Sequence, residues 1–248
     1  MKAIPRSCLP MDKFQQLFPP LTSRLIIFDV ETTGLDARYH EIIEIGAIEI
    51  IENEETRRFH EYACPARPIS KSVSDVHGLT LESLEGEQDS LTIAGRFIEW
   101  IGDTNEAYII GHNIKFDISF LEAALKVYNR INKENLQIPR NTICTLELIK
   151  IAFRRDSSLD QACKIFEIRD LKNRKKHGAM IDAELTMKLY FCMREWKFFS
   201  DTQGIASRKI KGKKGMKSTE RVLPWENGVK KQKCDVVEVV DDSDINIV

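Results

Sequence analysis

The sequence has no closely spaced cysteine pairs, no marked excess of either charge and no long apolar run. Its six cysteines are scattered along the 248 residues, which argues against a disulfide framework and against a zinc site. The formal net charge is only -1, so a strongly basic face that holds nucleic acid by itself is not expected. Because no segment has the pattern of a signal peptide or a membrane span, we expect a cytoplasmic protein without membrane contact.

The composition is that of a globular protein, with 42% apolar and 30% charged residues. Prolines interrupt residues 1–23, which we interpret as an N-terminal extension. Residues 24–203 have the apolar patterning of one folded domain. The composition changes over residues 204–248, where ten lysines and arginines accompany seven acidic residues. We expect this last segment to be a flexible, charged C-terminal tail.

Apolar periodicity predicts that strands dominate the first third of the domain and helices the last. Short apolar runs predict four strands, at residues 25–30, 42–51, 59–64 and 107–110. Helical spacing predicts five helices, at residues 91–101, 114–128, 146–153, 159–166 and 179–193. This order of elements is typical of an α/β fold with a mixed central sheet flanked by helices.

Four acidic residues occupy positions where the local pattern calls for apolar side chains. Asp29 and Glu31 share the inward face of the first strand at its carboxyl end. Asp117 and Asp182 each continue the apolar stripe of a predicted helix toward its start. His177 lies five residues before Asp182. The pattern therefore predicts four inward-pointing carboxylates with one histidine near the last of them.

Each of these residues alone has an ordinary structural explanation, such as a turn or the first turn of a helix. Together, four buried carboxylates without a countercharge would cost more than the whole stability of a typical domain. Divalent cations are the simplest partners, and an all-oxygen ligand set favours Mg²⁺ or Mn²⁺ over Zn²⁺. We therefore expect two divalent metal ions, hydrolysis of a phosphodiester bond, and His177 as the general base.

Three ordered segments resemble the motifs of the DEDDh-type 3'-5' exonucleases, a family of the DnaQ-like, ribonuclease H-like superfamily. The first is FDVETTGL at residues 28–35, and the second is GHNIKFDISFL at residues 111–121. The third is HGAMIDAELT at residues 177–186, whose His-x4-Asp spacing is typical of the histidine branch of the family. The resemblance spans residues 25–194 and implies a ribonuclease H-like fold.

The resemblance also implies roles for individual residues. The four carboxylates singled out above would bind the metal ions, and His177 would be the catalytic base. Substrate contacts would come from Asp29, Glu31, Thr32, His77 and Asp182. A histidine in a turn such as that at residues 75–80 could equally be structural.

Within this superfamily, three further segments resemble the proofreading epsilon subunits of bacterial DNA polymerase III. They are EIIEIGAIEI at residues 41–50, DVHGLT at residues 75–80 and SLDQACKIFEI at residues 158–168. This resemblance implies removal of nucleotides from single-stranded or frayed DNA 3' ends in association with a polymerase catalytic subunit. The C-terminal tail would bind that subunit, and a merely solubilising tail is the alternative.

Two other functions are compatible with the motifs. The same chemistry could act on RNA ends or short oligonucleotides without a polymerase, because metal and phosphate contacts do not distinguish the sugars. A scaffold module on the same fold is the non-enzymatic alternative, but all five residues that the chemistry needs are present. The motifs leave DNA and RNA ends open as substrates, and the resemblance to epsilon subunits is what implies DNA.

Overall fold

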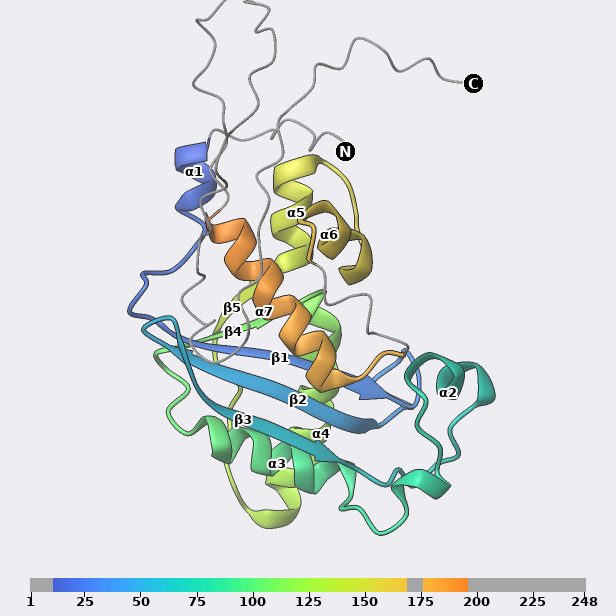
Figure 1. Cartoon of the computed structure of the whole chain (residues 1–248). Helices are drawn as coiled ribbons and strands as arrows, with labels where there is room; N and C mark the ends of the chain where they lie inside the picture. The colour runs from blue at the N-terminus through green and yellow to red at the C-terminus, as the bar shows by residue number, and fades with distance from the viewer. Residues whose placement is uncertain (1–10, 169–175, 196–248) are drawn as a thin grey trace, which may run out of the picture.

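The computed structural model describes residues 11–168 and 176–195, and these form a mixed five-stranded sheet with helices on both faces (Figure 1). The strands are β1 (Arg24–Thr32), β2 (Ile42–Ile51), β3 (Glu54–Tyr62), β4 (Ala107–Gly111) and β5 (Asn141–Cys144). They lie in the order β3-β2-β1-β4-β5. The pairs β1–β2 and β2–β3 are antiparallel, whereas β1–β4 and β4–β5 are parallel. This arrangement confirms the ribonuclease H-like mixed sheet that the sequence predicts.

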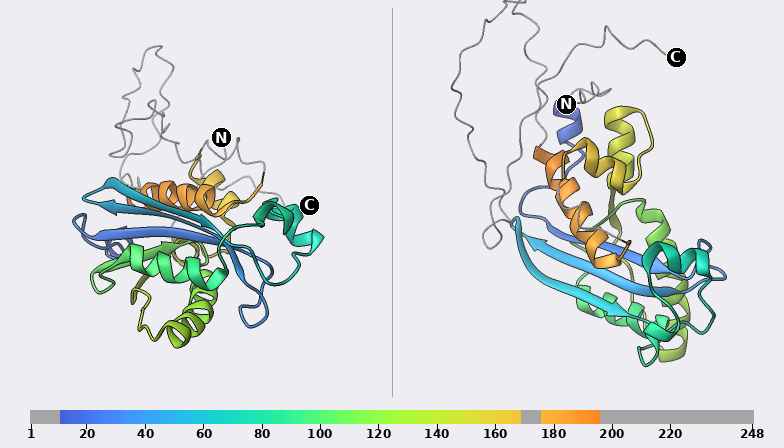
Figure 2. Two further views of the ribbon diagram at one scale, coloured as in Figure 1. Left: turned by 90° about the horizontal axis from the view of Figure 1, so that it is seen from below. Right: turned by 45° about the vertical axis from the view of Figure 1, so that its right-hand side comes forward.

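Two groups of helices cover opposite faces of the sheet (Figure 2). One face is covered by α7 (Ala179–Glu195) together with α5 (Thr145–Phe153) and α6 (Leu159–Ile165), and the other by α3 (Ser90–Ile101) and α4 (Ile114–Asn132). Along β1 the side chains alternate between two apolar clusters. Leu25 and Ile27 pack toward α7, whereas Ile26 and Phe28 pack toward α3 and α4.

Helix α7 lies directly against the backbone of β2 at Gly46. A Cβ atom at this position would be only 2.2 Å from the backbone nitrogen of Met180 and 2.4 Å from the carbonyl carbon of Ala179. Only glycine permits such a close approach of a helix to a strand. Gly46 pairs with Asp29 across the β1–β2 ladder, so the first turn of α7 is held next to the carboxyl end of β1.

The predicted elements are confirmed, with shifts of a few residues at their ends. Four further elements have weak apolar patterns: α1 (Met11–Gln15), α2 (Lys71–His77), the short 3-10 helix η1 (Glu82–Leu84) and β5. The third strand begins at Glu54 and ends at Tyr62, before the predicted 59–64 segment is complete. It is an edge strand whose first five residues are exposed and charged or polar, which hides the strand pattern in the sequence.

The described part of the N-terminal extension packs against the domain. Phe14 is fully buried in the cluster around α7, and its ring lies 5.5 Å from that of Phe18. Phe18 in turn lies 5.4 Å from the ring of Tyr190, and Arg194 donates a hydrogen bond to the Pro19 carbonyl at 2.7 Å. The predicted domain boundaries stay predictions, because residues 196–248, with the predicted tail, lie outside the described residues.

None of the helices in the described ranges is both long enough and apolar enough to cross a membrane.

Candidate active site

The carboxyl end of β1 carries two of the predicted metal ligands. Asp29 and Glu31 are partly exposed, whereas Asp117 and Asp182 are buried. The expectation of four buried carboxylates is therefore wrong for Asp29 and Glu31. Glu31 lies beyond the pair that Asp29 forms with Gly46, the residue against which α7 begins. The partial exposure of Asp29 and Glu31 leaves both side chains accessible to a substrate.

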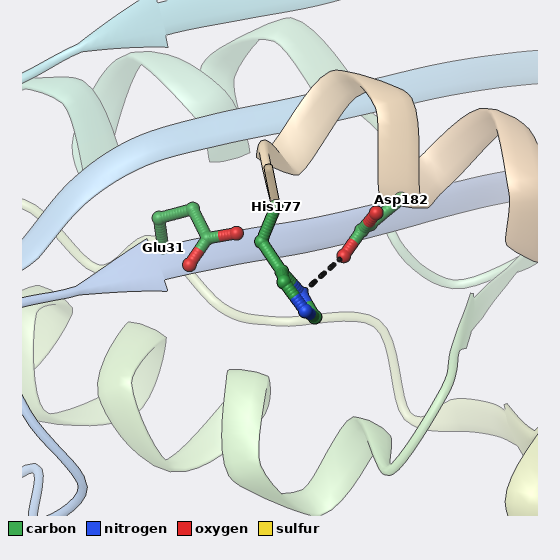
Figure 3. A group of neighbouring side chains, drawn as sticks. All are labelled: Glu31, His177 and Asp182. Carbon is green, nitrogen blue, oxygen red and sulfur yellow. Dashed lines mark hydrogen bonds and ion pairs between the residues drawn. The ribbon is translucent and has the colours of Figure 1, made fainter. Parts of the chain in front are cut away.

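Glu31, His177 and Asp182 form a compact group at this end of the sheet. One ligand atom from each lies within 4.8 Å of the others (Figure 3). The His177 Nδ1 atom is 3.2 Å from Oδ2 of Asp182, and the ring lies between the two carboxylates. The His177 side chain is 47% exposed, whereas that of Asp182 is 6% exposed. The histidine ring can thus reach both solvent and a buried carboxylate.

Asp117 is joined to the same strand through the backbone. It lies in the first turn of α4, and its Oδ1 accepts a hydrogen bond from the Val30 N–H at 3.2 Å. Val30 stands between Asp29 and Glu31, so this bond connects the second motif directly to the first. Burial raises the pKa of Asp117 far above its usual range, and the nearby charge of Asp182 raises it further, although the Val30 hydrogen bond opposes the shift.

The segment that carries His177 is held by α2, which periodicity does not predict. The His177 N–H donates to the Val76 carbonyl at 3.1 Å. Gly78, whose φ is 84°, packs closely on Lys176. A Cβ atom at residue 78 would lie 2.5 Å from the Cδ atom of Lys176. The sequence signal for this contact is the glycine of the DVHGLT segment, since a left-handed backbone conformation requires it.

Thr32 and His77, the two further predicted substrate contacts, are buried. The Thr32 hydroxyl donates to the Gly34 carbonyl at 2.6 Å, within the turn after β1. His77 Nδ1 accepts a hydrogen bond from the Leu79 N–H at 3.0 Å, and burial lowers the pKa of this histidine. Its Nε2 has no hydrogen-bond partner within residues 11–168 and 176–195. Their substrate roles stay predictions.

A further histidine of the second motif, His112, supports the start of α4 and was not singled out by the sequence pattern. Its Nδ1 lies 2.9 Å from the Thr145 hydroxyl, and its Nε2 lies 2.9 Å from the Ser157 carbonyl. Burial lowers the pKa of His112, while the Ser157 carbonyl raises it. This side chain therefore connects the second motif to the starts of α5 and α6.

Comparison with known proteins identifies the family. Residues 26–190 match a family model described as Exonuclease. The chain is 40% identical over 170 residues to DNA polymerase III subunit epsilon of Rickettsia conorii, covering 67% of this chain and 72% of that protein. It is 36% identical over 181 residues to the same subunit of Buchnera aphidicola subsp. Baizongia pistaciae, and this match covers 70% of this chain and 72% of that protein.

The fold is similar to that of solved exonucleases. The structure of Escherichia coli exonuclease I in complex with a dA16 oligonucleotide matches with a TM-score of 0.55 and 15% identity, covering 69% of this chain and 41% of that one. At this identity the match supports the fold alone. The family model and the epsilon-subunit relatives carry the assignment: the protein belongs to the exonuclease family, in the group that includes these epsilon subunits, and is a metal-dependent 3'-5' exonuclease.

Proposed function

We propose that this exonuclease removes mispaired nucleotides from DNA 3' ends as the proofreading partner of a bacterial DNA polymerase III. The observation that carries the proposal is the juxtaposition of Glu31, His177 and Asp182 within 4.8 Å of one another on this fold. The similarity to epsilon subunits supports the choice of partner and a cytoplasmic site of action. The polymerase would be bound through residues 204–248, the predicted tail.

Two divalent metal ions are proposed to bind at the end of β1, held by Asp29 and Glu31 of that strand, Asp117 of α4 and Asp182 of α7; of these four, Glu31 and Asp182 have ligand atoms within 4.8 Å of each other and of His177. Asp29, Glu31, Asp117 and Asp182 supply oxygen donors only, which suits Mg²⁺ or Mn²⁺. The raised pKa of Asp117 also fits, because a bound cation would favour the ionised form of a carboxylate that burial disfavours. When bound, such ions activate water and stabilise negative charge on the leaving oxygen.

His177 is proposed as the general base. With the Nδ1–H donated to Asp182 at 3.2 Å, Nε2 is the nitrogen that takes a proton from the attacking water. Asp182 holds the ring in this tautomer and orientation, and it stabilises the positive charge that the ring acquires. The 47% exposure of the side chain lets the proton pass on to solvent after the reaction.

Selectivity for mispaired ends follows from a preference for single strands. A mispaired 3' end separates from its template at lower cost than a matched end does. Thr32 and His77, beside the catalytic group, are proposed to contact the terminal nucleotide. The enzyme therefore needs no direct recognition of the mismatch.

Single-turnover digestion of matched and 3'-mismatched primer-templates tests the proposal. With Mg²⁺, we expect faster removal of the mismatched nucleotide and loss of this activity in His177→Ala. An RNA strand of the same sequence is the comparison substrate. Preference for RNA with indifference to the mismatch would assign the enzyme to RNA-end processing. Biological activity that persists after Asp29 and Glu31 are both replaced by Ala would indicate a scaffold.

A further inference from the structure

A fifth carboxylate lies next to the catalytic group and has no role in the chemistry proposed above. Glu44 of β2 stands directly opposite Glu31 in the β1–β2 ladder. Side chains opposite each other in a ladder point to the same face of the sheet, so Glu44 faces α7. It is only 3% exposed, whereas Glu31 is partly open to solvent. A buried carboxylate at this position needs specific partners to offset its desolvation.

Two side chains of the edge strand β3 meet the Glu44 carboxylate. The His60 Nε2 lies 2.8 Å from its Oε1, and the rings of His60 and Tyr62 are 5.0 Å apart. Burial and then the charge of Glu44 raise the pKa of the Tyr62 hydroxyl, so this hydroxyl also faces the carboxylate. The position of the Glu44 side chain is thus determined by the sheet.

On its other side the carboxylate meets the segment that carries the catalytic histidine. A Cβ atom at Gly178 would lie 3.9 Å from Oε2 of Glu44 and 4.0 Å from Oε1. The carbonyl of Gly178 accepts the first hydrogen bond of α7, from the Asp182 N–H at 2.9 Å. Negative charge at the start of a helix is favourable because the helix dipole places its positive end there. The Glu44 carboxylate therefore lies beside the end of α7 where negative charge is favourable, next to His177.

We propose that Glu44 is a positioning residue for His177. The Glu44 carboxylate packs against Gly178 at the start of α7, and the Val76 carbonyl accepts the His177 N–H. These two constraints orient the imidazole toward Asp182 and Glu31. The proposal rests on the proposed role of His177 as general base, and Glu44 itself contacts neither the substrate nor a reacting atom.

Glu44→Gln tests this role in the full chain, because it removes the charge with little change in size. Glu49→Gln is the matched control: Glu49 is also 3% exposed in β2, but its partners, Arg24, Thr56 and Arg57, lie away from the catalytic group. We expect Glu44→Gln to lower kcat on single-stranded DNA by about 10-fold or more, as loss of a supporting group typically does. We expect the KM for DNA and the affinity for Mn²⁺ to stay within about twofold. Glu49→Gln should leave kcat unchanged and lower only the stability.

A second readout does not depend on activity. Hydrogen–deuterium exchange of the His177 amide, measured without metal, should accelerate in Glu44→Gln and stay unchanged in Glu49→Gln, because loosening of residue 178 weakens the bond to Val76. If Glu44→Gln does not fold, His60→Leu can be used instead, because it removes the side chain that contacts the Glu44 carboxylate. This variant should show a smaller fall in kcat and a smaller acceleration of exchange. Wild-type kcat and exchange in the folded variant would overturn the proposal. A loss of Mn²⁺ affinity would also overturn it, since Glu44 would then be a metal ligand.

A double-mutant cycle separates this inference from the proposed function. If Glu44 acts through His177, Glu44→Gln should change the residual rate of His177→Ala by less than about twofold. Full additivity of the two substitutions would refute the positioning role while leaving His177 as the base. Full activity of His177→Ala would instead refute the proposed base, and the exchange measurement would still report whether Glu44 holds the His177 segment.

Discussion

The backbone N–H of Val30 donates a hydrogen bond to the Asp117 carboxylate at 3.2 Å, and this contact joins the end of β1 to the start of α4. The bond lies between residues 87 positions apart in the sequence. It makes Asp117 both a support of the β1 backbone and a proposed metal ligand. The two roles can be separated, because an amide oxygen can accept the same hydrogen bond without a charge.

Asp117→Asn is therefore expected to fold and to lose metal binding. The amide oxygen can still accept from Val30, whereas the charge that a cation requires is gone. We expect Mn²⁺ to raise the melting temperature of the wild-type protein and not that of the variant, with a loss of activity of about 100-fold or more. An equal Mn²⁺-dependent rise in both proteins would show that Asp117 does not bind the ion.

His177→Ala is expected to lose activity while it keeps metal affinity. Removal of a general base typically costs about 10²- to 10⁴-fold in rate. The four carboxylates stay in place, so Mn²⁺ affinity measured by calorimetry should change little. A large fall in Mn²⁺ affinity would instead make His177 a ligand of the metal.

Gly46→Ala is expected to destabilise the fold strongly. The new methyl group would lie 2.2–2.4 Å from backbone atoms of α7, so the helix would have to move away from the sheet. We expect a loss of about 3 kcal/mol or more in the free energy of unfolding, measured in urea. Gly86→Ala is the comparison: no atom lies within 4 Å there, although φ is 94°, so backbone strain of about 1–2 kcal/mol should be its whole cost.

Glu49 is expected to make the stability depend on pH. Burial raises its pKa, but hydrogen bonds from Arg57, Thr56 and Arg24 outweigh this and lower it to about 2. The folded-state pKa lies below the unfolded value, so the stabilisation is complete above about pH 4.5 and disappears as the pH falls toward 2. Glu49→Gln should lower the free energy of unfolding by about 2 kcal/mol at pH 7. The loss is limited to this size because the two arginine partners are partly exposed, and solvent weakens their attraction to the carboxylate.

The difference between wild-type protein and Glu49→Gln should shrink steadily when urea unfolding is measured at pH 7, 4 and 3. A difference that is constant across this range would show that the charge of Glu49 does not stabilise the fold.

Truncation after residue 203 is expected to separate catalysis from polymerase binding. The predicted tail contributes none of the proposed catalytic residues, so digestion of single-stranded DNA should continue at the wild-type rate. Co-purification with the polymerase catalytic subunit should be lost, because the tail is proposed to bind it. Unchanged co-purification would place the polymerase-binding surface on the exonuclease domain.

Local patterns in the chain determined much of the fold and most of the candidate site. The alternation in β1 and the stripes of α4 and α7 follow from the periods of strands and helices, which need no knowledge of distant contacts. The same periods indicate that Asp29, Glu31, Asp117 and Asp182 point inward, because an acidic residue on an apolar stripe is conspicuous within its own element. His177 was identified by its spacing from Asp182.

Only the tertiary structure decided the exposure of these side chains and the contacts around them. Asp29 and Glu31 are partly exposed, and α7 begins beside Gly46, the partner of Asp29, through a packing contact between segments more than 130 residues apart. Helix α2 has no apolar stripe, and it supports His177 through the backbone carbonyl of Val76. Glu44 is conspicuous as a charged residue in the apolar strand β2, but its partners on β3 and its place beside the start of α7 are visible only in the folded structure. Hydrogen bonds to the backbone and buried charged contacts depend on which segments of the chain lie side by side in the fold. Local periodicity carries no information about these long-range neighbours.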